Sequence, residues 1–358
     1  MILTRYLNRQ VLQATAALSF VLLVVAVLGR LLRYLGQASQ GELDPGVLLI
    51  LMAYRIPGFL QLILPLALLL GILLAYGRMY ADNEMTVLGA CGISGKRLFR
   101  ITLLSTVFTA MLVASLSLYL TPRSLARAAA LIETQANLNE FDLMVPGIFQ
   151  NMSDGARTSY AQTMEEGVMY QVFMHEAQAD RVIVAESAQL AEGEDGRRLV
   201  EFRNGSLTEG LNGDKPLTVT SFATMGVVLP QRELVFEPVL DVEAMPNGEL
   251  FNAGTADQRA ELQWRFSLVV LIPVLTLLAV PFSRVNPREG QFARIVPAIL
   301  LYMGYFGLLL VSRDLIARDS LPASVGLWWV HAMFAIIGWL LISGKAATLP
   351  GLGRFAHV

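Results

Sequence analysis

The class of fold follows from the stretch IPGFLQLILPLALLLGILLAY, which runs from Ile56 to Tyr76 and contains no charged residue. About 20 apolar residues in a helix are enough to cross the hydrocarbon core of a bilayer. The rest of the chain agrees with this stretch, because 54% of the 358 residues are hydrophobic and the mean hydropathy is +0.54. Soluble domains rarely reach that balance, so we expect an α-helical membrane protein.

Five further stretches approach this one in length and composition, which predicts six transmembrane helices in two groups of three. In chain order the predicted spans are Val11–Leu32, Ile56–Tyr76, Leu98–Leu120, Phe266–Phe282, Ile295–Val311 and Val325–Ile342. The first span is too long for the apolar core of a signal peptide, and no small-residue cleavage site is evident after it. We therefore expect it to be an uncleaved membrane anchor.

Lysine and arginine residues are shared unevenly between the two sides of this layout. The side that holds Arg5, Arg9, Arg78 and Lys96 is the richer one, and the positive-inside rule places it, with both termini, in the cytoplasm. The long polar segment between the third and fourth spans then lies outside, because long domains are translocated largely regardless of their charge. The predicted organisation is a helical part over 1–121, an outer insert over 122–262 and a second helical part over 263–358, with a short cytoplasmic tail.

The insert has the pattern of an all-β domain between helical linkers. Three runs, RVIVAESAQL, RRLVEFRNGSLTEG and LTVTSFATMGVVL, are rich in β-branched residues with partial alternation. The stretches SDGA, EDGR, RNGS and NGDKP offer turn chemistry between strands. Frequent turns between short strands favour a sandwich, a jellyroll or a partly open barrel. The flanking segments PRSLARAAALIETQANLNEFDL and ELFNAGTADQRAELQWR are predicted to be helical.

Composition and motifs exclude several kinds of chemistry. The net charge of −2 gives no cationic footprint for a nucleic acid. The single cysteine, Cys91, can form neither an intrachain disulfide nor a cysteine zinc cluster. The stretch GACGISGKR resembles a phosphate-binding loop, but Ala90 stands at the first glycine position and Arg97 at the hydroxyl position. We therefore expect this chain to bind no nucleotide, metal or cofactor.

The segment YADNEMTVLGACGIS is the most distinctive part of the predicted cytoplasmic side. We expect a short helix over about residues 80–91, in which Met85 and Leu88 form a small apolar stripe. Asp82 and Glu84 are expected in its first turn, where carboxylates suit the helix dipole. Such a helix is either a docking surface for another protein or a turn lying on lipid headgroups, and composition alone leaves both open.

Arg30 and Arg33 lie three residues apart at the outer end of the first span, so they share a helix face. One interpretation is that both side chains extend to the membrane interface while their stems stay in lipid. The other is that they bind anionic phosphate groups, which the planar guanidinium suits. The spacing by itself favours the first interpretation.

The histidines carry no recognisable catalytic or metal motif. His331 lies in the sixth predicted span, where we favour a neutral imidazole hydrogen-bonded between helices over a functional proton site. His175 and Glu176 form an isolated pair, which we expect on a strand face or in a turn. Four charged residues after the fifth span are expected to form a solvated outer loop without a functional role: Arg313, Asp314, Arg318 and Asp319.

Several of these segments together match one known transporter pattern. YADNEMTVLGACGIS is similar to a cytoplasmic coupling helix, AELQWRFSL (Ala260–Leu268) and VNPREGQ (Val285–Gln291) to segments that flank the fourth span, and RYLNRQVL to an opening segment. In this combination the chain resembles the LptF/LptG permease family of the lipopolysaccharide export ABC transporter over essentially its whole length. ACGIS, VNPREG and the opening segment are more similar to the LptF branch than to LptG.

The resemblance implies a bacterial inner-membrane permease that pairs with an LptG-like permease above an LptB-like ATPase dimer. Lipopolysaccharide would leave the inner membrane through an outward cavity, and a β-jellyroll insert would pass it to an LptC-like single-span protein and the periplasmic bridge protein LptA. ATP would be used by the partner ATPase, and this chain would catalyse no bond change. One alternative within the family is the LptG paralogue. Two alternatives from other classes are a mechanotransmitting ABC subunit that moves a periplasmic domain without passing substrate, and a membrane-anchored periplasmic enzyme.

The resemblance also assigns roles to residues of this sequence. Glu84 takes the place of the coupling-helix carboxylate that contacts the ATPase, and its neighbours on the expected helix share that contact. Arg30 and Arg33 match the cationic end of the first span, which faces the phosphates of the lipid. The expected ATPase-coupling residues are Asp82, Glu84, Met85 and Leu88.

Overall fold

The computed structural model describes residues 2–39, 45–136, 146–152, 157–165, 167–177, 179–192, 198–210, 216–228, 241–252, 254–284 and 294–343. The turn stretches SDGA and EDGR, most of NGDKP, and the segment VNPREGQ lie outside these residues. The chain divides into two units. One comprises Met1–Leu28, Ala53–Ala128 and Val239–Val358, and the other Gly29–Met52 and Ala129–Pro238.

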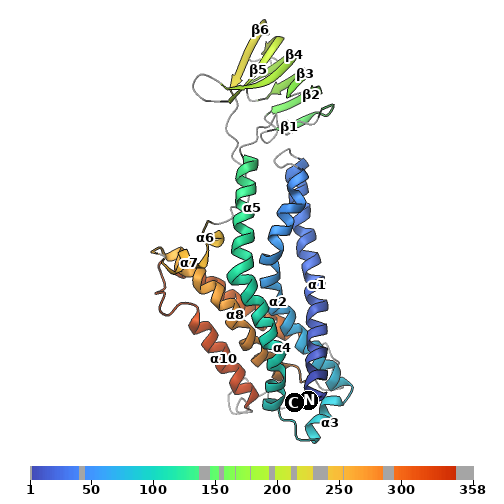
Figure 1. The fold of residues 1–358 in the computed structure, drawn as a ribbon, viewed down its shortest axis with the longest axis vertical. Helices are drawn as coiled ribbons and strands as arrows, with labels where there is room; N and C mark the ends of the chain where they lie inside the picture. The colour runs from blue at the N-terminus through green and yellow to red at the C-terminus, as the bar shows by residue number, and fades with distance from the viewer. Residues whose placement is uncertain are drawn as a thin grey trace. The chain divides into compact units, whose positions relative to one another are not determined.

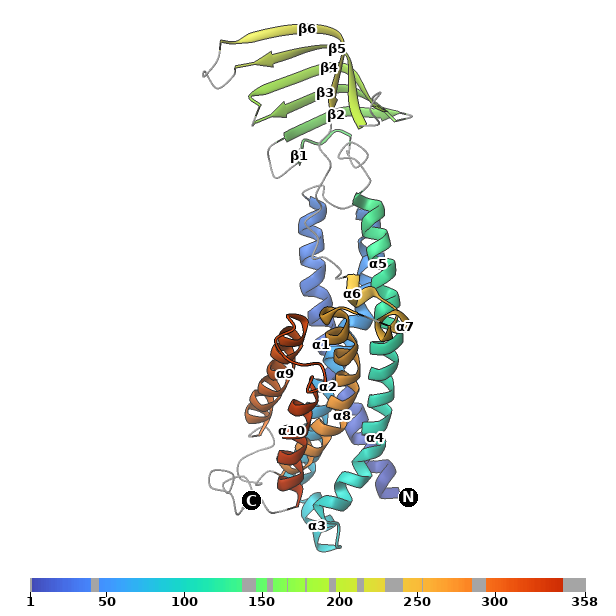
Figure 2. The same ribbon diagram turned by 90° about the vertical axis from the view of Figure 1, so that its left-hand side faces the viewer.

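Long helices dominate the structure, and five helical segments are long and apolar enough to cross a membrane. They are α1 (Ile2–Ser39), α2 (Leu48–Ala81), α4 (Gly95–Ser115) with its continuation, α8 (Ala256–Phe282) and α9 (Ile295–Ala317). Helix α4 continues through a π-helical turn, η2 (Leu116–Leu120), into α5 (Thr121–Ala136). At the position of the sixth predicted span lies the 15-residue apolar helix α10 (Trp328–Ile342), drawn beside α8 and α9 in Figure 2.

Most of these helices are longer than the apolar runs that predicted them, because helices continue past the hydrocarbon core into polar sequence. The segment expected as one helix before α8 is instead broken into α7 (Asn247–Phe251) and α8, with α6 (Asp241–Ala244) before them. Helix α8 starts at a capping box, which separates it from α7. The Thr255 hydroxyl accepts from the Gln258 backbone N–H at 3.4 Å, and the Gln258 side chain accepts from the Thr255 N–H at 3.3 Å. A short 3₁₀ turn, η1 (Pro45–Val47), precedes α2.

The helical core lies where α2, α4, α8, α9 and α10 pack together, and its largest fully buried side chains include Tyr76 and Tyr305. Helices α1 and α2 approach closely at Gly71, where an added Cβ would lie 2.9 Å from the backbone nitrogen of Thr15. Helices α1 and α4 are joined by Asn8, whose side chain accepts from the Ser105 N–H at 2.9 Å and donates to the Ile101 carbonyl at 2.9 Å. Small residues and interhelical hydrogen bonds are what hold helices together in lipid.

The second unit contains one antiparallel sheet whose described strands lie in chain order (Figure 1). The strands are β1 (Gln150–Met152), β2 (Arg157–Glu165), β3 (Val168–Glu176), β4 (Arg181–Glu192), β5 (Arg198–Glu209) and β6 (Thr218–Val228). The three predicted runs are strands β4, β5 and β6. The expected turn at RNGS is wrong, because Arg203–Ser206 lies inside β5, and there Asn204 adopts a φ of 51° within the strand.

The sheet bends along a line that crosses five of its strands. At this line the alternation of buried and exposed residues along each strand shifts by one position. In β3, for example, buried Met169 is followed by two exposed residues and then by buried Val172. The residues on the line are Gln162, Gln171, Glu186, Asn204 and Ala223, which interrupt the pairing register between neighbouring strands. Gln171, like Asn204, has a positive φ, 50°. The bend lets one face of a single sheet enclose its own core, and Figure 2 shows the strands curving over.

Candidate functional site

The predicted coupling helix is shorter than expected. Helix α2 continues to Ala81, a turn follows, and α3 comprises only Glu84–Ala90. The turn is set by Asn83, which precedes α3 with a left-handed φ of 62°, a conformation that asparagine tolerates better than most residues. Asp82 therefore lies in the turn and not in the first helical turn, whereas Glu84 is the first residue of α3. Figure 1 shows α3 at the same end of its unit as the N-terminus.

Burial separates the predicted coupling residues into two groups. Met85 is 6% exposed and belongs to the helical core, and Leu88 packs against that core. These two side chains anchor α3, so Met85 is not exposed for docking in this chain, and its contact with an ATPase stays a prediction. Asp82 and Glu84 are exposed, and so is Val87, whose side chain is 61% exposed. The surface that another protein can reach is therefore the one formed by Glu84 and Val87 together with the turn.

Helix α1 contributes to this surface. The Tyr6 hydroxyl donates a hydrogen bond of 3.1 Å to a carboxylate oxygen of Glu84. An open groove of about 390 Å³ lies beside this contact and is lined by Leu3, Tyr6, Met79, Asp82, Asn83, Glu84, Val87 and Leu88. Sequence reasoning missed Tyr6, because 78 residues separate it from Glu84 and its local sequence carries no sign of the contact. The arrangement positions the carboxylate at a groove that a side chain or loop of a partner can enter.

Arg30 and Arg33 lie on α1 as expected but in different surroundings. Arg30 is 7% exposed, and its guanidinium lies 5.0 Å from the centre of the Tyr34 ring, which is a cation–π distance. Arg33 is exposed. Their three-residue spacing does not give them equal access to a ligand. Arg33 can meet an anionic group directly, whereas Arg30 is held against an aromatic ring.

A partly buried ionic network joins α8 and α9, and the sequence pattern gave no sign of it. Glu261 accepts from Arg265 Nε at 2.8 Å and from an Arg313 terminal nitrogen at 2.8 Å, and Arg313 also reaches Glu243 at 3.0 Å. The expectation that Arg313 and Asp314 lie in a solvated loop is wrong, since both are in α9. The error arises because the predicted span ended where charges begin, whereas the helix continues. These groups line a half-open cavity of about 400 Å³ that also includes Arg55.

The interpretation of His331 as an imidazole hydrogen-bonded between helices is confirmed. Its Nε2 lies 2.7 Å from the Ser267 hydroxyl of α8, and its Nδ1 lies 2.5 Å from the Tyr305 hydroxyl of α9. Both hydroxyl residues are fully buried and His331 is 4% exposed. This buried trio links three helices.

His175 and Glu176 are explained by the sheet. Both lie in β3, and Glu176 forms ion pairs with Arg157 of β2 and Arg181 of β4. Burial acts to raise the pKa of Glu176, but the hydrogen bonds from the two arginines outweigh it, so the pKa lies below its usual value. The pair is therefore part of strand packing. Within the described part of the chain, no group of three His, Cys, Asp or Glu side chains could hold a metal ion.

Comparison with known proteins agrees with this architecture. The family model described as lipopolysaccharide export system permease LptF/LptG matches residues 5–343. The chain is 30% identical over 347 residues to the lipopolysaccharide export system permease protein LptF of Escherichia coli strain K12, covering 95% of this chain and 94% of that protein. The protein of the same name from Shigella flexneri matches with the same identity and coverage. This chain, with its apolar helices, its inserted sheet and the short helix α3, belongs to the LptF/LptG family of lipopolysaccharide export permeases.

Proposed function

We propose that this chain is a transmembrane permease subunit of an ABC transporter that extracts lipopolysaccharide from the inner membrane and passes it to a periplasmic bridge. Family membership over nearly the whole chain supports the substrate class, which the names of the relatives state. The observation that carries the coupling part is α3, a short helix between two long apolar helices, whose exposed Glu84 is held by Tyr6 of α1.

In this proposal the chain works in a complex. It pairs with an LptG-like permease, and an LptB-like ATPase dimer docks on the exposed face of α3 and hydrolyses the ATP. The chain itself binds no cofactor and catalyses no bond change. Extraction needs such an energy source, because each buried CH₂ of an acyl chain contributes about 0.8 kcal/mol to membrane retention. An LptC-like single-span protein and the bridge protein LptA then receive the lipid from the β insert.

The lipid-facing part of the proposal rests on Arg33 and Arg30. We propose that Arg33, which is exposed, contacts the anionic phosphates of lipopolysaccharide, while Arg30 supports the same region through its stacking on Tyr34. A photo-cross-linker placed at position 33 should label lipopolysaccharide in membranes. Absence of cross-linking there, with intact ATPase coupling, would favour a mechanotransmitting subunit that passes no substrate.

The topology in this proposal has six membrane spans, both termini in the cytoplasm and a periplasmic β-jellyroll insert. Cys91 provides the test, because it is the single cysteine of the chain and it is exposed directly after α3. A membrane-impermeant maleimide should label it in inverted membrane vesicles and not in intact spheroplasts. Labelling from the periplasmic side would reverse the orientation and remove the coupling role of α3.

Charge reversal tests the coupling surface directly. Glu84→Lys should abolish or strongly reduce co-purification of the ATPase with the permease pair, because it places a cation in the position of an exposed carboxylate and breaks the contact with Tyr6. Glu165→Lys is a matched control, since Glu165 is an exposed carboxylate at the end of β2. Normal ATPase recovery and normal lipopolysaccharide transport with Glu84→Lys would refute the coupling role of this residue.

A further inference from the structure

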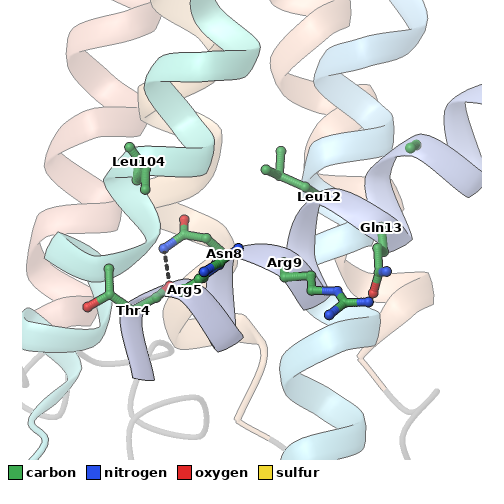
Figure 3. A pocket seen from close by; sticks show the side chains of 8 residues that line it. Thr4, Arg5, Asn8, Arg9, Leu12, Gln13 and Leu104 are labelled. Carbon is green, nitrogen blue, oxygen red and sulfur yellow. Dashed lines mark hydrogen bonds between the residues drawn. The ribbon is translucent and has the colours of Figure 1, made fainter. Parts of the chain in front are cut away.

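A second open groove lies at the start of α1, on the side of this helix that meets α4. It has a volume of about 710 Å³ and is lined by Thr4, Arg5, Asn8, Arg9, Leu12, Gln13, Ala16 and Leu104. Figure 3 shows Leu104 of α4 on one side of the groove and Leu12 of α1 opposite, with Arg9 and Gln13 beside each other on the side away from Leu104. The groove lies in the helical unit and shares no lining residue with the groove at α3.

The groove is positively charged. Its lining contains two guanidinium groups and no carboxylate. Arg5 and Arg9 are four residues apart on α1, so they project from one face of the helix one turn apart. Both are exposed, and neither forms an ion pair with another described residue. Two adjacent guanidinium groups suit a phosphodiester, which each can bind through two parallel hydrogen bonds.

The groove continues as an apolar face. Leu12 and Ala16 follow the arginines along the same side of α1, and Phe20 comes next at the four-residue spacing with 68% of its side chain exposed. On α4, Leu104, Phe108 and Met111 repeat at helical spacing and are 61%, 59% and 68% exposed. A cationic end that runs into an exposed apolar face has the polarity of one lipid molecule, headgroup first and acyl chains after.

The floor of the groove is held in place by hydrogen bonds of Asn8. Asn8 is 4% exposed, and besides its contacts with α4 it donates to the Thr4 carbonyl at 2.8 Å, the bond that Figure 3 marks. Its carboxamide oxygen also accepts from the Ser105 hydroxyl at 2.5 Å. These bonds fix the separation of α1 and α4, and with it the width of the groove. A preformed site of this kind costs a ligand little ordering free energy.

We propose that this groove binds an anionic glycerophospholipid of the surrounding membrane, with its phosphodiester between Arg5 and Arg9 and an acyl chain along Leu12, Ala16 and Leu104. The occupant is a structural lipid and not the transported one. The inference stands on the groove itself, so it holds or fails independently of how ATP is coupled to export.

The test uses the purified permease complex in nanodiscs that contain equal amounts of phosphatidylglycerol and phosphatidylcholine. Lipids that remain bound after release from the nanodisc are counted by native mass spectrometry. The unaltered protein should retain phosphatidylglycerol selectively. Arg5→Gln with Arg9→Gln should lower that selectivity by about 30-fold, because each basic side chain at a membrane surface contributes roughly a fivefold preference for anionic lipid.

Two control variants make the result specific. Arg97→Gln with Arg100→Gln removes the same number of exposed arginines from the start of α4, outside the groove, and should leave retention unchanged. Leu104→Trp should lower retention by filling the apolar wall, whereas Leu300→Trp, at an exposed position on α9, should not. Thermal unfolding of every variant shows that the fold survives.

Three results would overturn the proposal. An equal loss of phosphatidylglycerol retention in both double arginine variants would mean that retention depends on the total positive charge of the protein and not on this groove. Unchanged retention in Arg5→Gln with Arg9→Gln would mean that no anionic lipid is held there. Protection of position 104 by the second permease subunit, with lipid excluded from the assembled complex, would mean that a protein partner covers the groove.

Discussion

Arg265 is the residue whose removal should most change the attachment of the segment between the sheet and α8. Its side chain is 3% exposed and its three nitrogens make five hydrogen bonds. The acceptors are Glu261 at 2.8 Å, the carbonyls of Met245, Glu243 and Val242 at 2.9, 2.9 and 3.3 Å, and the Asn247 side chain at 2.6 Å. Four of these five acceptors lie in residues 241–252, so one buried guanidinium holds α6 and α7 against α8.

Arg265→Met keeps an unbranched side chain but removes all five bonds. A typical hydrogen bond contributes about 1 kcal/mol net, and breaking a buried ion pair costs about 3–5 kcal/mol. Glu261 keeps its contact with Arg313, so we expect a loss of about 4 kcal/mol, the contribution of the four bonds to residues 241–252 at about 1 kcal/mol each. If the helical core holds, the loss appears as local opening, and amide hydrogen exchange over 241–252 should accelerate about 1000-fold.

Hydrogen exchange measured by mass spectrometry on the full chain reports this directly. Arg259→Met is the control, because Arg259 lies on the same helix but is 45% exposed, with a 3.6 Å contact to Asp319 that is also exposed. Surface pairs of this kind contribute about 0–1 kcal/mol, so exchange over 241–252 should stay within a fewfold of the unaltered protein. Exchange in Arg265→Met that is no faster than in Arg259→Met would refute the proposed attachment.

Three further changes test other parts of the structure. Glu176→Gln should lower the stability of the sheet by about 2 kcal/mol at pH 7; because the folded-state pKa is depressed, this deficit should vanish as pH falls through that pKa in denaturant titrations. Gly71→Val should destabilise the helical unit by about 3 kcal/mol, since its Cβ would meet the Thr15 backbone, whereas Gly304→Val, with open space around it, should barely shift the melting temperature. Gln171→Gly should raise the stability of the sheet by about 1 kcal/mol by relieving its positive φ; a lower midpoint of unfolding would contradict the bend.

The sequence predicted those parts of the fold whose signal is local. Apolar runs marked the helices, because lipid demands an unbroken stretch of apolar residues, and β-branched runs marked β4, β5 and β6. Strands β2 and β3 were missed, since their sequences are rich in methionine, glutamine and tyrosine and their alternation breaks at Gln162 and Gln171. A shift of phase within a strand is invisible to a pattern of period two, and so is the bend that it produces.

The candidate site divides in the same way. Glu84 stands out in the sequence because it lies in a short polar stretch between apolar ones, but Tyr6 and Arg313 do not. The contact of Tyr6 with Glu84 depends on how α1 packs beside α3, and that of Arg313 with Glu261 on the register of α9 against α8. Burial also could not be read from the sequence. Met85 belongs to an amphipathic stripe in the sequence, but in the structure its side chain is buried and anchors α3.

Four residues separate the end of α3 from the start of α4, and the first turns of α4 carry polar side chains that reach three other helices. Thr102, Ser105 and Thr106 are all buried. Their partners are the Tyr76 hydroxyl of α2 at 2.7 Å, the carboxamide oxygen of Asn8 of α1 at 2.5 Å and the Thr276 hydroxyl of α8 at 3.0 Å. In lipid, where apolar packing alone gives little preference for one helix over another, such bonds fix which helices move together. In the proposed coupling, a force delivered to α3 would reach α1, α2 and α8 through one short segment of α4, and the Tyr6–Glu84 bond would tie α1 to the same point a second time. Coupling between an ATPase and the helices that surround a lipid requires that they share a displacement and not merely a contact. In the proposed transporter, these hydrogen bonds would supply the physical means for that sharing.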